Sequence, residues 1–124
     1  MAQKRILVVE DDPSMRKILH ARLKAENYDA VPVADVVSAF GEVRKHTTDL
    51  ILLDLGIPGG GGLNLMQRLQ SIPKLATIPI VVVSARERTG IEAEVLDGGA
   101  VAFFQKPIDF DELLKKIREM LGEA

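Results

Sequence analysis

A small set of polar residues stands at the ends of the apolar segments of this chain, and their side chains are those of a phosphoryl-transfer site. These residues are Glu10, Asp11, Asp54, Ser84 and Lys106. Carboxylates gathered at one place repel one another unless a cation neutralises them, and oxygen ligands favour a hard ion such as Mg²⁺. A carboxylate nucleophile, Mg²⁺, an ammonium group and a hydroxyl form a workable site, because in this chemistry the protein mainly positions groups and neutralises charge.

Five apolar segments rich in β-branched residues precede these polar positions and predict β-strands. The predicted strands span residues 6–9, 30–33, 50–53, 78–83 and 101–104. Most of them are apolar on both faces, which is typical of strands buried under helices in a parallel sheet. Pro32 lacks a backbone donor, so the second strand is predicted to lie at an edge or a bulge.

Amphipathic segments alternate with these strands and predict five helices. Asp12 and Pro13 are typical of a helix start, Asp35 begins the second helix, and Asp109 and Glu112 have capping-box spacing before the last. The recurring apolar positions are Met15, Ile18, Leu19 and Leu23 in the first helix, Val36, Ala39, Phe40 and Val43 in the second, Leu63, Met66 and Leu69 in the third, residues 91–96 in the fourth, and Phe110, Leu113, Leu114, Ile117 and Leu121 in the fifth.

Five consecutive strand–helix units predict a doubly wound α/β fold, a five-stranded parallel sheet with five helices in the flavodoxin-like (βα)5 arrangement. A length of 124 residues suits one domain, so residues 1–124 are interpreted as a single unit. Ligands of such sheets bind beyond the carboxyl ends of the strands, and the polar residues stand at those ends.

The composition excludes several other classes of protein. A formal net charge of −2 disfavours direct nucleic-acid binding, and the absence of cysteine excludes disulfides and thiolate sites. No apolar stretch approaches the ~20 residues needed to cross a bilayer, and the first residues run into a predicted strand and not into a secretory leader. We therefore expect a cytoplasmic protein without membrane insertion.

Four segments resemble the hallmark segments of response regulator receiver domains of two-component signalling systems. They are residues 6–12 (ILVVEDD), 50–62 (LILLDLGIPGGGG), 80–86 (IVVVSAR) and 99–107 (GAVAFFQKP). The similarity covers essentially the full chain, in order, with the family's spacing between Asp54, Ser84 and Lys106. One segment alone is weak evidence, whereas the complete set is highly specific.

The resemblance implies a role for each residue of the predicted site. Asp54 matches the phosphoacceptor, and Lys106 matches the lysine that contacts the phosphoryl group. Glu10 and Asp11 match the acidic pair that holds Mg²⁺, and the backbone carbonyl of Gly56 matches a further metal ligand. The resemblance further implies that the protein is a signalling phosphoacceptor, which assists its own phosphorylation and dephosphorylation, and is not an enzyme with a separate substrate.

The resemblance also implies a conformational switch. Ser84 matches the switch hydroxyl, Phe103 matches the switch aromatic, and a cis peptide bond before Pro107 is expected. The surface that changes would be formed by the predicted helix at 91–96, the strand at 101–104 and the last helix. Gly56 and Arg86 are predicted to tune the rate, Gly56 by leaving the acyl phosphate open to water and Arg86 by steering donors or partners.

The implied partners are a histidine kinase or phosphotransfer protein as phosphoryl donor, an unidentified output protein, and a second copy of the chain bound through the switch surface. The sequence leaves one alternative within the family, a pseudo-receiver that binds partners without phosphorylation.

A flavodoxin-like electron carrier is disfavoured, because Glu10, Asp11 and Asp12 would repel a flavin phosphate and only Tyr28 is left to stack a ring. The glycine run at 59–62 lacks the Lys-Ser/Thr of a P-loop and is interpreted as a mobile loop beside Asp54.

Overall fold

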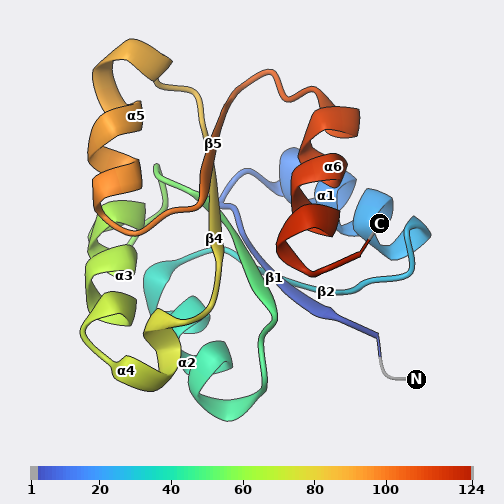
Figure 1. Ribbon diagram of the computed structural model, residues 1–124, viewed down its shortest axis with the longest axis horizontal. Coiled ribbons are helices and arrows are strands. Elements are labelled where there is room, and N and C mark those ends of the chain that lie inside the picture. Colours follow the sequence, from blue (N-terminus) through green and yellow to red (C-terminus); the bar gives the residue numbers. More distant parts are fainter. Residues whose placement is uncertain (1–2, 124) are drawn as a thin grey trace.

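Five parallel strands form one sheet in the order β2-β1-β3-β4-β5 in a computed structural model, which describes residues 3–123 (Figure 1). The strands are β1 (Arg5–Val9), β2 (Asp29–Val33), β3 (Leu50–Asp54), β4 (Ile80–Ser84) and β5 (Ala102–Gln105). Their number, order along the chain and parallel pairing confirm the predicted doubly wound fold. β2 is an edge strand that pairs only with β1, which explains why Pro32 is tolerated there.

Within residues 3–123, six helices cover the two faces of this sheet. They are α1 (Pro13–Ala25), α2 (Val36–Lys45), α3 (Gly61–Gln70), α4 (Pro73–Ala76), α5 (Arg88–Asp97) and α6 (Phe110–Met120). Figure 1 shows α1 and α6 on one side of the sheet and α2, α3 and α5 on the other. The prediction of five helices missed α4, because a helix of four residues is too short to show an apolar period. Every helix within residues 3–123 falls short of the length and apolarity that a bilayer span requires.

Carboxylate caps fix where three of the helices begin. Asp12 accepts a hydrogen bond from the backbone N–H of Ser14 at 3.3 Å, and Asp35 accepts one from Ser38 at 2.7 Å. Asp109 accepts from the backbone N–H of Glu112 at 3.2 Å. Each cap satisfies a donor that has no partner within its helix, so these three predicted helix starts are confirmed.

The core consists of two apolar layers, one on each face of the sheet, and successive strand residues alternate between them. Leu7 and Leu53 face the α2, α3 and α5 side, whereas Val8 and Leu52 face the α1 and α6 side. Ile18, one of the recurring apolar positions of α1, is 52% exposed. Leu19 and Leu23 are the residues that α1 buries completely.

The strands β1, β2, β3 and β5 lie within one residue of their predicted limits, whereas β4 and α5 begin two or more residues away from theirs, for local reasons. The backbone N–H of Ile78 bonds to the carbonyl of Leu75, so Ile78 belongs to the turn after α4, and β4 begins at Ile80. α5 begins at Arg88, before the predicted residue 91, and buries only Ile91 and Val95. The apolar period therefore revealed only the centre of α5.

Candidate functional site

The carboxyl ends of β1, β3, β4 and β5 bring the predicted site residues to one edge of the sheet. Glu10 follows β1, Asp54 ends β3, Ser84 ends β4 and Lys106 follows β5. Asp54 pairs in register with Val83, the neighbour of Ser84 in β4. The parallel register thus gathers groups that are up to 96 residues apart in the chain.

Lys106 links the two buried carboxylates of the site. Its Nζ lies 2.7 Å from Oε1 of Glu10 and 3.5 Å from Oδ2 of Asp54. Burial alone would lower the pKa of Lys106, but the hydrogen bond to Glu10 and the charge of Asp54 outweigh that effect and raise the pKa. Lys106 therefore stays protonated at neutral pH and places a fixed positive charge beside Asp54.

The backbone of β5 and the turn after it orient this lysine. The backbone N–H of Lys106 donates to the carbonyl of Ser84 at 2.7 Å, which ties the turn to the end of β4. The peptide bond between Lys106 and Pro107 is cis, as predicted.

Glu10 is the most deeply buried charged group of the site, with 1% of its surface exposed. Besides the Lys106 contact, its Oε2 accepts a hydrogen bond from the backbone N–H of Asp12 at 3.3 Å. Burial, and then the hydrogen bond with Asp54, raise the pKa of Glu10 to about 7, although Lys106 acts in the opposite direction. A single lysine does not fully compensate the negative charge gathered here.

Three carboxylates of the site are close enough to share one cation. One oxygen from each of Glu10, Asp11 and Asp54 lies within 4.8 Å of the other two, and Asp11 is exposed while the other two are buried. The donor atoms are all oxygens, which suits a hard ion such as Mg²⁺. Both the donor set and the raised pKa of Glu10 fit a site that is completed by a divalent cation.

Asp54 presents its carboxylate beside a residue without a side chain. Its Oδ1 accepts a hydrogen bond from the backbone N–H of Gly56 at 3.2 Å. A Cβ added at Gly56 would lie 3.9 Å from this oxygen, so a larger residue there would stand over the carboxylate. This geometry supports the rate-tuning role predicted for Gly56, which stays a prediction, as does the role of its carbonyl as a metal ligand.

The two residues of the predicted switch are both buried. Ser84 is 2% exposed, and its Oγ accepts a hydrogen bond from the backbone N–H of Arg86 at 3.0 Å. Phe103 is 4% exposed and packs in the core layer under α5, where the guanidinium of Arg88 lies 5.5 Å from the ring centroid. The exposed side chain of Arg86 lies at the rim of the site. The movements that the switch requires stay predictions.

Arg16 supports the site but was given no role by the sequence analysis. Its Nη1 donates to the backbone carbonyl of Glu10 at 3.0 Å and to that of Asp11 at 3.3 Å. One guanidinium group thus holds the backbone of both acidic residues. A cation one helical turn after the cap Asp12 was the available signal, because that spacing returns a side chain toward the loop before the helix.

Comparison with known proteins gives results that agree with this geometry. Residues 6–118 match the family model of the response regulator receiver domain. The chain is 30% identical over 121 residues to the polar-differentiation response regulator DivK of Brucella anthropi, and the match covers 98% of each protein.

Solved structures are similar over nearly the full chain. The receiver domain of a Francisella response regulator superposes with a TM-score of 0.90 at 22% identity, covering 97% of this chain and 98% of that one. The receiver domain of the sensor histidine kinase PA1611 from Pseudomonas aeruginosa superposes with a TM-score of 0.89 at 25% identity, covering 98% and 100%. The PA1611 structure contains a magnesium ion coordinated in its active-site cleft.

Proposed function

Because this chain belongs to the response regulator receiver domain family, we propose that it is a signalling phosphoacceptor whose Asp54 receives a phosphoryl group from a histidine kinase or phosphotransfer protein in a Mg²⁺-dependent reaction. The observation that carries the proposal is the buried arrangement in which Lys106 bridges Glu10 and Asp54. The proposal takes residues 1–124 as one receiver domain that acts in the cytoplasm and makes no direct contact with nucleic acid.

Each residue of the site has a distinct task in the proposed reaction. An oxygen of Asp54 attacks the phosphorus atom of phosphohistidine, so that an O–P bond forms as the N–P bond breaks and the histidine nitrogen keeps the electron pair. Lys106 stabilises the negative charge on the transferring oxygens. Glu10, Asp11, Asp54 and the Gly56 carbonyl would hold Mg²⁺, which supplies charge neutralisation and orientation of the phosphoryl oxygens when it is bound.

The product must then bias a conformational equilibrium. The phosphoryl group adds negative charge and strong acceptor oxygens, to which the hydroxyl of Ser84 can donate. Moving an equilibrium from 1:99 to 99:1 requires about 5.5 kcal/mol of differential stabilisation. A few charge-assisted hydrogen bonds of roughly 1.5–3 kcal/mol each supply that amount.

We assign the responding surface to α5, β5 and α6, the elements that the sequence analysis placed at 91–96, 101–104 and 109–121. Phe103 lies in β5 beneath α5, so its movement would change the packing of both elements. Leu96 and Val101 are 41% and 39% exposed at the end of α5 and just before β5. These apolar side chains favour contact with an output protein or with a second copy of the chain.

Intact-mass measurement with a small phosphodonor, such as acetyl phosphate, tests this function. We expect one labile phosphoryl group on the wild-type protein with Mg²⁺, and none with a chelator or with Asp54→Asn. Lys106→Ala should still bind Mg²⁺ but gain the phosphoryl group at least about tenfold more slowly, because the fixed charge beside Asp54 is lost. A wild type that stays unmodified with small donors and with histidine kinases would instead indicate a pseudo-receiver.

A further inference from the structure

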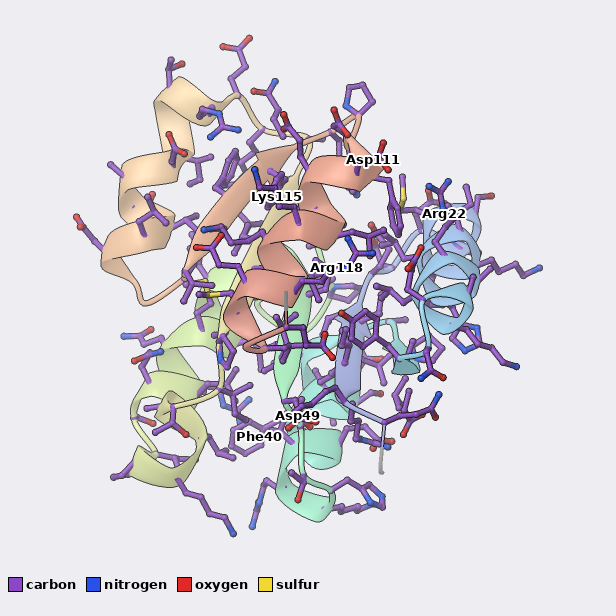
Figure 2. All side chains as sticks on the ribbon, turned by 45° about the vertical axis from the view of Figure 1, so that its right-hand side comes forward. Arg22, Phe40, Asp49, Asp111, Lys115 and Arg118 are labelled. Atoms are coloured by element: carbon purple, nitrogen blue, oxygen red, sulfur yellow. The ribbon has the colours of Figure 1, made fainter. Side chains whose placement is uncertain are left out.

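A groove at the edge of the sheet opposite to Asp54 is lined by cationic and apolar side chains, and the proposed phosphorylation gives these side chains no role. It is a cavity of about 440 Å³ between α2 and the α3–α4 segment, which continues into a second one between the end of α2 and the start of β4. The lining residues that matter most are Phe40, Val43, Arg44, Lys45, Lys74 and Leu75. Figure 2 shows Phe40 at the same end of the molecule as Asp49, the residue before β3.

The rim of this groove is cationic. Arg44, Lys45 and Lys74 are exposed, and within residues 3–123 none of the three forms an ion pair. No aspartate or glutamate lines either part of the groove. Moreover, the sequence contains no acidic residue between positions 55 and 86, although the chain as a whole has a net charge of −2.

The acidic residues nearest in sequence are occupied elsewhere. Glu42 bonds to Nη2 of Arg5 at 2.9 Å, and Asp49 accepts a hydrogen bond from the backbone N–H of Arg5 at 2.7 Å. Both carboxylates are therefore used to hold the start of β1. These two carboxylates are therefore not seen to neutralise the positive charge of the groove.

The floor of the groove is apolar and contains one aromatic ring, Phe40, over which two guanidinium groups lie. Val43 and Leu75 are buried, and Phe40 is partly buried beside them. The guanidinium groups of Arg68 and Arg44 lie 4.6 and 5.8 Å from the Phe40 ring centroid. Because cations already occupy the ring, Phe40 is a poor platform for a nucleic-acid base, which binds by stacking.

We propose that this groove docks an acidic protein segment that carries an apolar side chain between its carboxylates. The apolar side chain would cover Ile72 and Leu75, while the carboxylates would pair with Arg44, Lys45 and Lys74. Charge complementarity of this kind mainly raises the association rate and selects the partner. The groove lies at the amino ends of the strands and Asp54 at the carboxyl ends, so the docked segment would not contact the phosphorylation site.

Fluorescence anisotropy with a labelled peptide that alternates glutamate and leucine tests this docking. We expect saturable binding to the wild type that weakens as salt increases, and no binding of a matched peptide with glutamine in place of glutamate. The double variant Arg44→Glu/Lys74→Glu should bind the acidic peptide at least about tenfold more weakly. Amide NMR signals of residues 40–48 and 72–78 should shift on titration with the peptide.

A matched double variant provides the control. Lys17→Glu/Lys115→Glu makes the same change of net charge on exposed residues of α1 and α6, and it should keep the wild-type affinity. Circular dichroism should show that both variants are folded. The proposal is overturned by equal losses in the two variants, by no binding to the wild type, or by groove-dependent binding of a single-stranded oligonucleotide without binding of the peptide.

Discussion

Arg16 shows how one side chain outside the reacting groups can control their positions. Its guanidinium holds the carbonyls of Glu10 and Asp11, so it fixes the backbone that carries two of the proposed metal ligands. Groups that orient metal ligands commonly affect affinity by 10–100-fold when they are removed. Arg16 is therefore a positioning residue for the proposed metal site.

Replacing Arg16 tests that role directly. We expect Arg16→Leu to weaken Mg²⁺ binding by about tenfold or more, because the backbone carbonyls of Glu10 and Asp11 lose their hydrogen bonds from the guanidinium group. Isothermal titration calorimetry with Mg²⁺ measures the change without any phosphoryl donor. Lys17→Leu, on the same helix but exposed, should bind Mg²⁺ like the wild type. Equal Mg²⁺ affinity of the Arg16→Leu and wild-type proteins would contradict the positioning role of Arg16.

The residue types of the site were predictable, whereas their supporting contacts were not. Glu10, Asp54 and Lys106 were identified because strand ends of a parallel sheet meet at one edge. Arg16 was missed, because its contact depends on how α1 leans back over the loop before it. The exposure of Ile18 has a related reason, since helical spacing defines an apolar stripe but not how much of that stripe the sheet covers.

At the scale of elements, α3 packs onto the loop after β3 through Gly62. A Cβ at this position would lie 2.8 Å from Cα of Leu55 and 2.9 Å from the carbonyl oxygen of Asp54. Both are backbone atoms, so the contact cannot be relieved by rotating a side chain. The close approach keeps the start of α3 against the residues that carry Asp54.

A pair of alanine substitutions separates this contact from the general effect of glycine in a helix. Gly62→Ala should lower the free energy of unfolding by roughly 1–3 kcal/mol, because the new methyl group overlaps backbone atoms. Gly41→Ala, within α2 and with nothing within 4 Å of the added Cβ, should raise it by roughly 0.5–1 kcal/mol. Urea titrations of both variants measure the two effects. Equal changes of the same sign would rule out the overlap.

The kinds and order of the elements followed from apolar periods, Pro32 and the capping residues, which act locally. The short α4 was not predicted, because Pro73–Ala76 forms a single helical turn. The limits of α5 were misplaced because this helix buries only two side chains. Local patterns therefore identify the elements that bury a wide apolar stripe, and they fail where an element is short or mostly exposed.

At the scale of the whole molecule, folding buries Glu10 and makes stability depend on pH. A carboxyl group whose pKa is higher in the folded than in the unfolded chain contributes stability at low pH, and this contribution is lost as pH rises through the folded value. For Glu10 the pKa rises from 4.5 to about 7, so the metal-free protein should lose stability between these values.

Urea midpoints across this pH window, measured with a chelator, test the effect. Glu10→Gln should reduce the decrease, because the glutamine does not ionise, and Mg²⁺ should reduce it in the wild type by binding the ionised form. Glu94→Gln, an exposed change on α5, should leave the pH profile as it is in the wild type. A Glu10→Gln protein with the full wild-type pH dependence would show that another group is responsible.

The sequence by itself determined the doubly wound sheet, the family and the residues at the strand ends. Alternating apolar segments and the polar residues after them are patterns of residues that are close together in sequence. Only the tertiary structure decided which groups touch. It placed Lys106 between Glu10 and Asp54, brought Arg16 onto the acidic loop, and gathered the cations of α2 and α4 into one groove. These contacts depend on packing between segments distant in sequence, and such packing leaves no periodic signal.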